Sequence, residues 1–223
     1  FLNPLADPYI IGIASAATFG AVIAYLLGLS DVFYGIFAFL AASGLSLVIF
    51  KLAAHTRSIS TLLIVGIAVS SFLGAFTSFA VYLIGEDSFR ITAWMMGYLG
   101  GANWQKIALL LPPLLFCMAY FYAKRHELNI ILNGDEEAKS LGLNVERSKK
   151  SLLIVSSLII GFSVAFTGMI GFVGLIIPHT LRMALHTASN AVLIPASALT
   201  GGVFLVFCDV IAKNALSPVE IPI

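Results

Sequence analysis

The sequence predicts an all-α protein, a bundle of membrane-spanning helices with about seven full or partial crossings. Of the 223 residues, 60% are hydrophobic and only 10% are charged, whereas soluble domains carry roughly 25% charged residues. The mean hydropathy is +1.02, and the apolar runs are about twenty residues long, enough to cross ~30 Å of hydrocarbon. We therefore expect one transmembrane domain over residues 1–223. The net charge of +1 gives no reason to expect a nucleic-acid partner.

Among the first three spans, the first contains a pattern of small residues that favours close helix packing. Gly12, Ala16 and Gly20 fall on one face of the first span, and such spacing lets another helix approach closely. General use of glycine and alanine in membrane helices is the alternative. These spans are expected at 9–29, 32–53 and Ile59–Ile84.

An aromatic, glycine-rich segment at 94–104 follows the third span. It is too short and too broken to cross, and its Trp and Tyr residues suit the membrane–water boundary, so we expect an interfacial helix and loop. The fourth span is expected at 106–123. It is either kinked near Pro112 and Pro113 or begins just after them.

The second half of the chain contains a span that should be broken. After a crossing at 151–168, residues 168–179 include Gly168, Gly171, Gly174 and Pro178, which argue against one continuous helix. A broken or re-entrant pair is expected, and such backbone is tolerated at membrane depth only where protein or water covers it. The last span is expected at 188–212, with residues 214–223 beginning an exit loop.

The basic residues predict the orientation, because cytoplasmic loops carry an excess of Lys and Arg. If the gap before Ile59 is cytoplasmic, only Arg90, Lys106 and Lys213 lie outside. The other nine then share the cytoplasmic side: Lys51, Arg57, Lys124, Arg125, Lys139, Arg147, Lys149, Lys150 and Arg182. This places the first residue inside and the 94–104 loop outside.

The chain ends and the two cysteines carry less information. The sequence opens at Phe1 without an initiator Met or a basic n-region, and both ends are expected to be cut from a longer protein. Cys117 and Cys208 lie in apolar runs and are interpreted as small buried hydrophobes rather than a disulfide or metal ligands.

Residues 134–143 form a charged stretch in an otherwise apolar chain. We expect a loop, a short helix and a turn, with Asp135 as N-cap and Gly142 as C-cap. A solvated linker is the alternative interpretation. A polar helix at the cytoplasmic face of a membrane bundle would suit the docking of a soluble partner.

The same stretch carries a resemblance to a known family. Gly134, Glu136, Ala138, Leu141 and Gly142 match a motif in the cytoplasmic loop of the FecCD-type permeases, the membrane subunits of ABC importers for iron–siderophore, haem and cobalamin. Three other segments are similar to motifs of that family, in the same order: residues 3–8, residues 94–97 with Trp104, and residues 171–179 with Arg182.

The resemblance implies a ten-span fold, of which this chain would lack the first two spans and the last. It also implies that the translocation pathway is lined by the family's fifth and tenth helices. The fifth corresponds to Ile59–Ile84, and the tenth is not in this sequence. Small residues recur on one side of Ile59–Ile84, where a weakly polar pathway or ordinary helix packing would both explain them: Ser70, Ser71, Gly74, Thr77 and Ser78.

A few ionisable residues lie in or beside the apolar spans, where such groups are costly and often functional. Pro178, His179 and Arg182 are expected to anchor the structure at the cytoplasmic edge, since a metal site or proton relay would need more ligands nearby. Asp209 is expected to pair with Lys213 one turn on or with another helix. A proton-coupling role for Asp209 is the alternative.

The sequence has neither a G-x-x-x-x-G-K-[ST] motif nor a catalytic constellation, so neither ATP hydrolysis nor a bound cofactor is expected on this chain. The resemblance implies a multi-pass permease subunit in a prokaryotic cell membrane. Its implied partners are a second copy of itself, an extracytoplasmic substrate-binding protein and an ATPase subunit that holds ATP and Mg. Coupling would run through residues 126–149, by way of Gly134, Asp135, Glu136, Ala138, Leu141 and Gly142.

Two other functions stay open from the residues alone. One is a secondary transporter driven by protons or metal ions, for which acidic residues at the midplane of discontinuous helices would be the signature. The other is an assembly fragment that does not transport.

Overall fold

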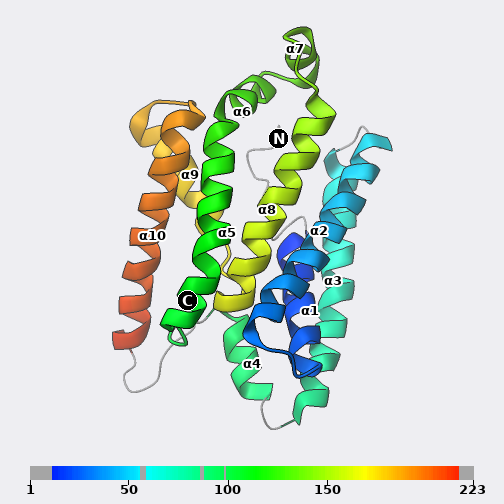
Figure 1. The fold of residues 1–223 in the computed structure, drawn as a ribbon, viewed down its shortest axis with the longest axis vertical. Helices are drawn as coiled ribbons and strands as arrows, with labels where there is room; N and C mark the ends of the chain where they lie inside the picture. The colour runs from blue at the N-terminus through cyan, green and yellow to red at the C-terminus, as the bar shows by residue number, and fades with distance from the viewer. Residues whose placement is uncertain (1–11, 56–58, 86–87, 98, 216–223) are drawn as a thin grey trace.

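The computed structural model describes residues 12–55, 59–85, 88–97 and 99–215. Within these residues the fold is all helical, as predicted, with ten α-helices and no strand. The helices are α1 (Ile13–Leu26), α2 (Asp31–His55), α3 (Ile59–Ile84), α4 (Ser88–Met95), α5 (Trp104–Ala123), α6 (Arg125–Leu132), α7 (Asp135–Ser140), α8 (Val145–Thr167), α9 (Val173–Leu185) and α10 (Asn190–Ala215) (Figure 1).

Among the described residues, five helices are long and apolar enough to cross a membrane: α2, α3, α5, α8 and α10. Two shorter apolar helices, α1 and α9, have 14 and 13 residues, which at 1.5 Å per residue is about 20 Å and less than the ~30 Å of a hydrocarbon core. Together they account for the predicted seven full or partial crossings.

Several boundaries differ from the expected ones. The first span ends early because α1 closes in a Schellman motif: the amide of Leu29 donates to the carbonyl of Ala24, and that of Gly28 to the carbonyl of Tyr25. The interfacial helix, α4, precedes most of the aromatic segment instead of forming from it. Helix α5 begins at Trp104 and contains both Pro112 and Pro113. The expected start of the first span at residue 9, and the family-like segment at 3–8, lie outside the described residues.

The core forms where α2 packs between α1 and α8. Its buried side chains are nearly all small: Ile13, Ala14, Ala17, Ala21, Ala38, Ala42, Val164 and Ala165. A Cβ at Gly20 would lie 2.4 Å from the carbonyl oxygen of Phe37, and one at Gly161 would lie 2.6 Å from the backbone of Phe39. The predicted packing face is therefore confirmed, because Gly12, Ala16 and Gly20 are all buried.

A hydrogen bond adds specificity to this apolar contact. The hydroxyls of Ser46 in α2 and Ser157 in α8 lie 2.6 Å apart, and both side chains are fully buried. Interhelical hydroxyl bonds of this kind help to hold membrane helices together where the hydrophobic effect offers no discrimination between lipid and protein.

The predicted break after α8 is present. Helix α8 ends at Thr167, its C-cap Gly168 has a φ of +72°, and α9 begins after a non-helical stretch. The break is docked on α4: the Met169 amide donates to the Met95 carbonyl, and a Cβ at Gly168 would lie only 1.8 Å from the carbonyl oxygen of Trp94. Only glycine fits this position, on grounds of both φ and space.

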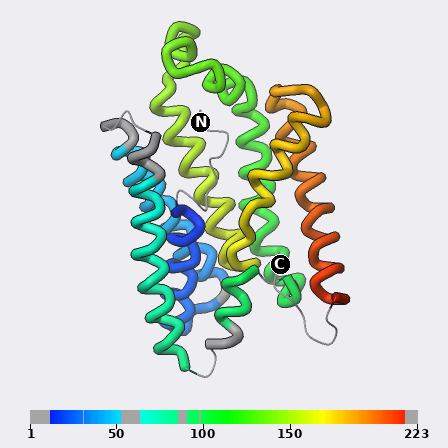
Figure 2. The backbone as a smooth tube through the Cα atoms, turned by 180° about the vertical axis from the view of Figure 1, so that it is seen from behind, coloured from blue at the N-terminus to red at the C-terminus, as the bar shows by residue number. Residues whose placement is uncertain are grey.

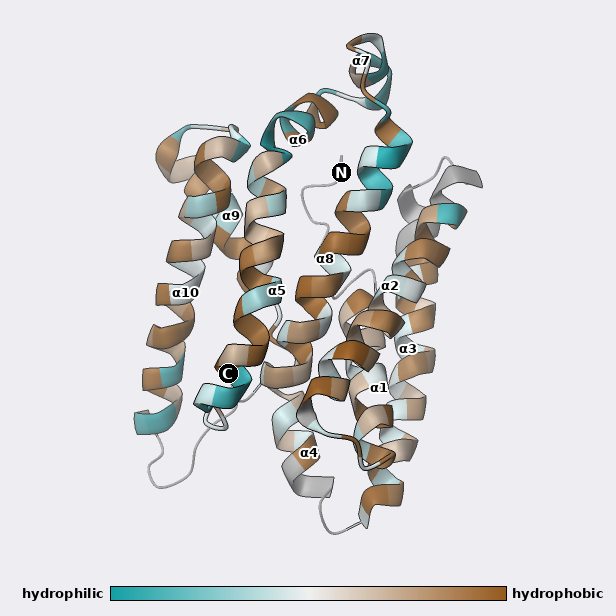
Figure 3. Ribbon diagram, in the orientation of Figure 1, coloured by the Kyte–Doolittle hydropathy of each residue, from teal (hydrophilic) through white to brown (hydrophobic). Residues whose placement is uncertain are grey.

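The helices are arranged with two distinct ends. Figures 1 and 2 show α6 and α7 at one end, and α4, the start of α5 and the end of α10 at the other. Lys106 and Lys213 thus lie at the opposite end from Lys139 and Lys149, as the charge distribution predicted. Figure 3 shows apolar residues along the long helices and hydrophilic residues gathered over α6, α7 and the first turns of α8.

Candidate functional site: a polar cap at one end of the bundle

Residues 124–144, here called the polar cap, connect α5 to α8. Helix α6 leads into α7 through Gly134, whose φ of +121° turns the chain. Gly134 is the N-cap of α7 and Asp135 is its first residue, so the prediction of Asp135 as N-cap was wrong by one position. The acidic residues Asp135, Glu136 and Glu137 fill the first turn, where the helix macrodipole favours negative charge.

The end of α7 is also sharply defined. The amide of Leu143 donates to the carbonyl of Ala138, and that of Gly142 donates to the carbonyl of Lys139, which together form a Schellman motif. Leu141 is the C-cap, and Gly142 follows it with a φ of +83°. Gly142 therefore ends the helix as predicted, but it is the residue after the C-cap and not the C-cap itself.

An ion pair fixes α7 to α8. The Nζ atom of Lys149 donates to both carboxylate oxygens of Asp135, at 2.6 Å and 2.5 Å. Asn144 then caps α8, because its side-chain oxygen accepts from the amide of Arg147. The predicted short helix is thus present, and the ion pair with Lys149 attaches its first residue to α8, which argues against the alternative of a solvated linker.

A second polar cluster fixes α6 to α8. One carboxylate oxygen of Glu127 accepts from Lys124 Nζ at 2.5 Å, and the other accepts from the Ser148 hydroxyl at 2.7 Å. Burial raises the pKa of Glu127, but the hydrogen bonds from Lys124 and Ser148 outweigh it, so the pKa lies below its ordinary value. The hydrogen bond to Glu127 correspondingly raises the pKa of Lys124.

The two apolar residues of the predicted docking helix have opposite surroundings. Ala138 is completely buried inside the chain, whereas Leu141 is 63% exposed. Ala138, which the sequence predicts as a coupling residue, therefore lies inside the chain, where its methyl group holds α7 in place instead of facing a partner. Leu141 is the large apolar side chain of this segment that a partner could reach.

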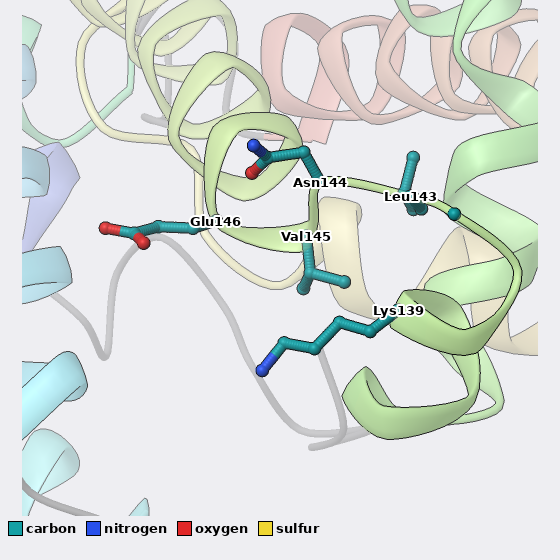
Figure 4. Close-up of a pocket in the computed structure, with 6 residues that line it drawn as sticks. Lys139, Leu143, Asn144, Val145 and Glu146 are labelled. Atoms are coloured by element: carbon teal, nitrogen blue, oxygen red, sulfur yellow. The ribbon is translucent and has the colours of Figure 1, made fainter.

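A shallow pocket lies beside α7. It is lined by Lys139 from α7, by the turn that follows and by the first residues of α8: Gly142, Leu143, Asn144, Val145 and Glu146 (Figure 4). Its lining mixes one cation and one anion, Lys139 and Glu146, with polar and apolar residues, so it offers no concentrated charge for a small charged ligand.

The polar cap also reaches α10. Both the backbone amide and the side-chain Nδ2 of Asn190 donate to Oδ1 of Asn129 in α6, at 3.0 Å and 2.7 Å. These residues are 61 positions apart, and no periodicity or motif in the sequence indicated that they meet. Only a prediction of how α6 and α10 pack could have found the contact.

The proposed pathway residues on α3 do not all face the same surroundings. Thr77 is buried and Ser70 is half-buried, with the Ser70 hydroxyl 2.7 Å from where a Cβ of Gly12 in α1 would be. Ser71 and Ser78 are exposed, and a Cβ at Gly74 would meet open space. The hydroxyls of Ser70, Ser71 and Thr77 each donate to a carbonyl one turn earlier. Two of the five residues, Ser70 and Thr77, are therefore packed within the structure, and the other three border an open face.

The remaining sequence candidates lie apart from the polar cap's contacts. Pro178 lies inside α9, and His179 and Arg182 are exposed. Asp209 accepts from Lys213 Nζ at 2.7 Å, one turn on, which confirms the expected pair.

Comparison with known proteins shows what class of molecule this is. The chain matches the FecCD transport family along residues 1–223. It is 41% identical to the cobalamin import system permease protein BtuC of Halobacterium salinarum over 218 residues, which are 96% of this chain and 58% of the relative. It is 38% identical to an uncharacterized ABC transporter permease protein, YvrB, of Bacillus subtilis, over 99% of this chain and 65% of the relative.

The hemin transport system permease protein HmuU of Yersinia pestis is 35% identical over all of this chain and 69% of its own length. A solved structure of a transporter assigned to the metal-chelate ABC type, in an inward-facing conformation, aligns with a TM-score of 0.86 and 32% identity. That alignment covers 99% of this chain and 71% of the solved chain.

The fold and the comparisons define a multi-pass membrane protein of a transport class. The chain belongs to the FecCD transport family. It spans between about half and two thirds of the length of the first relatives it matches, 58% of one and 65% of the other.

Proposed function

We propose that this chain forms part of the membrane permease of an ABC importer that moves a metal chelate inward. The observation that carries the proposal is the match to the FecCD transport family from residue 1 to residue 223. The relatives' names favour haem or cobalamin as substrate class, because cobalamin and hemin permeases are both among them. The motif resemblance adds iron–siderophores. The sequence of the bundle does not choose among these chelates.

The polar cap is the proposed docking site for the ATPase subunit, which would hold ATP and Mg. Three features support this. The cap lies at the end of the bundle to which the basic residues assign the cytoplasm, it projects beyond the apolar helices (Figure 3), and it is tied to α8 by two polar clusters. A contact that transmits movement needs such attachment, since a loose linker would absorb the displacement.

Within the cap, Leu141 is the proposed anchor. Buried apolar anchors carry most of the free energy of protein–protein interfaces, while charges at the rim carry little. Leu141 is 63% exposed and directly precedes Gly142, which lines the pocket beside α7. The charged residues Glu136, Glu137 and Lys139 of α7 are also exposed. Gly134, Asp135, Ala138 and Gly142 shape and hold the helix that presents Leu141.

The proposed translocation pathway runs along the exposed side of α3, past Ser71, Gly74 and Ser78. Their small size would leave room for a bulky chelate, and the Ser71 hydroxyl, which already donates to the Ile67 carbonyl, would offer only weak polar contact. A second copy of the permease would close the pathway, and an extracytoplasmic binding protein would deliver the chelate at the end where α4 lies. The Asp209 carboxylate, which a proton-driven transporter would have used, is paired with Lys213, so we do not favour that alternative.

The test is reconstitution of the full-length protein with a matching ATPase subunit and binding protein in liposomes. ATP-dependent accumulation of radiolabelled cyanocobalamin, haemin or a ferric hydroxamate would support the proposal, as would copurification of the ATPase. Uptake driven by a proton gradient without ATP, with no ATPase copurifying, would refute it.

A further inference from the structure

The contact between Asn129 in α6 and Asn190 at the start of α10 has a defined chemistry. A backbone N–H can only donate, so the atom of Asn129 that receives the Asn190 amide at 3.0 Å must be the side-chain oxygen. The same oxygen accepts from Asn190 Nδ2 at 2.7 Å. This assignment fixes the orientation of both amide groups without appeal to hydrogen positions.

The contact caps α10 from another helix. The first N–H groups of a helix have no partner within that helix, and Asn129 supplies one for the first residue of α10. The turn before it is equally ordered: the Ser189 carbonyl accepts from the amides of Val192 and Leu193, and the Thr187 hydroxyl oxygen accepts from the Ser189 amide. Asn129 therefore holds a defined junction between α9 and α10.

Helix α6 lies between two sets of contacts, one with α8 and one with α10. On one side the polar cap is joined to α8, through Asp135 with Lys149 and through Glu127 with Ser148. On the other side, Asn129 joins it to α10, which also packs on α9 and α5. Only Leu193 and Ala212 of α10 are buried within the described structure, so few side chains would resist a shift of this helix.

We propose that Asn129 is a positioning residue that passes movement of the polar cap to α9 and α10. The inference rests on the proposed function: if movement of the ATPase subunit displaces the cap, the two hydrogen bonds to Asn190 make the start of α10 move with α6. Their directional geometry is what separates this link from general apolar packing, which would let the helices slide.

The test uses the full-length permease, with its ATPase subunit and binding protein, reconstituted in liposomes. The transported probe is whichever of cyanocobalamin, haemin and the ferric hydroxamate the wild type takes up. Asn129→Leu preserves size but removes the acceptor. Asn129→Asp keeps an oxygen that accepts both bonds. Asn190→Ala keeps the backbone bond and removes only the side-chain bond. Asn214→Leu, at the far end of α10, is the matched control for losing an asparagine.

The measured quantity is the amount of chelate taken up per ATP hydrolysed, in samples whose subunit composition has been checked. Asn129→Leu should lower this ratio by about fivefold or more, the lower end of typical coupling factors between sites. Asn190→Ala should lower it less, Asn129→Asp should restore most of it, and Asn214→Leu should leave it unchanged.

A wild-type ratio in Asn129→Leu would overturn the inference while leaving the proposed function intact, and so would an Asp variant that is as uncoupled as Leu. If Asn129→Leu fails to assemble, a wild-type ratio in Asn190→Ala overturns the inference. A wild type without ATP-driven uptake would refute the proposed function and, with it, this link.

Discussion

Lys149 Nζ lies 2.6 Å and 2.5 Å from the two carboxylate oxygens of Asp135, so the first residue of α7 is joined to the second turn of α8. Both side chains are partly exposed, at 20% and 43%, and exposed pairs of this kind contribute only modest free energy. The main effect of the pair is to fix the orientation of α7, a six-residue helix that could otherwise rotate about Gly134.

Separating this pair should loosen α7 locally. For Lys149→Met we expect the amides of α7 to exchange hydrogen up to roughly fivefold faster, since exposed ion pairs stabilise by about 1 kcal/mol or less. The measurement is hydrogen–deuterium exchange by mass spectrometry on the purified protein. The double exchange Asp135→Lys with Lys149→Asp should restore much of the protection. Protection that is unchanged in the single variant would show that the pair does not hold α7.

Leu141 should be required for ATPase binding, whereas Glu137 should not. Leu141→Ser is expected to weaken the complex by about thirtyfold, the effect of losing an interface anchor worth ~2 kcal/mol. Glu137→Gln, at an exposed rim position, should bind almost as the wild type does. Affinity is measured by titrating the ATPase subunit onto the full-length permease in nanodiscs. Equal affinities for the two variants would contradict the assignment.

Ala138→Asp should abolish ATPase binding for a different reason. Ala138 is completely buried, and a carboxylate placed there would lack a partner and would have to leave the interior. We therefore expect fast hydrogen exchange throughout α7 in this variant, in contrast to Leu141→Ser, where α7 should keep its protection. An Ala138→Asp protein with a protected α7 and no binding would instead restore a direct contact role for this residue.

The Glu127 cluster should make stability depend on pH in the acid range. The pKa of Glu127 is below its ordinary value, which is about 4.3 in an unfolded chain. The unfolded state therefore binds more protons between the two pKa values, and stability falls as the pH drops through that window. The thermal advantage of the wild type over Glu127→Gln should be constant at neutral pH and shrink below about pH 4. An advantage that grows on acidification would reverse the sign and refute this account.

Gly161 should not tolerate even a methyl group. A Cβ there would lie 2.6 Å from the backbone of Phe39, and such overpacking costs typically 1–3 kcal/mol. Gly161→Ala should lower the unfolding temperature in detergent by several degrees, about 2–4 °C per kcal/mol for a protein of this size. Gly44→Ala is the matched control, because a Cβ at Gly44 meets nothing within 4 Å. A drop of the same size in both variants would mean that the close contact is not responsible.

The parts of the fold that the sequence predicted well depend on local signals. The third span was expected at the residues that form α3, and the small-residue face of α1 was expected to pack, because both follow from hydropathy and helical spacing. The Asp209–Lys213 pair was likewise within reach, since it spans one helical turn. The break after Gly168 was indicated by its glycines and proline.

The parts that were missed depend on neighbours far along the chain. Nothing in the sequence of α7 and its C-cap shows that Ala138 is buried and Leu141 exposed, because the burial depends on how α6 and α8 pack against this segment. The N-cap was misassigned since Asp135 is a good cap by type, but the ion pair with Lys149 uses its carboxylate elsewhere. The Asn129–Asn190 contact joins helices whose relative placement no short motif encodes.

The backbone contacts of Gly20 and Gly161 also limit which helices can move relative to one another. With α1 against Phe37 and α8 against Phe39, α2 meets both neighbours at these two points through peptide groups, which cannot rearrange as flexible side chains can. Sliding of these three helices past one another would force carbonyl groups through occupied space. Distances measured across α1, α2 and α8 should therefore stay constant through a transport cycle, and labels on these helices give a fixed frame against which displacement of the others can be read.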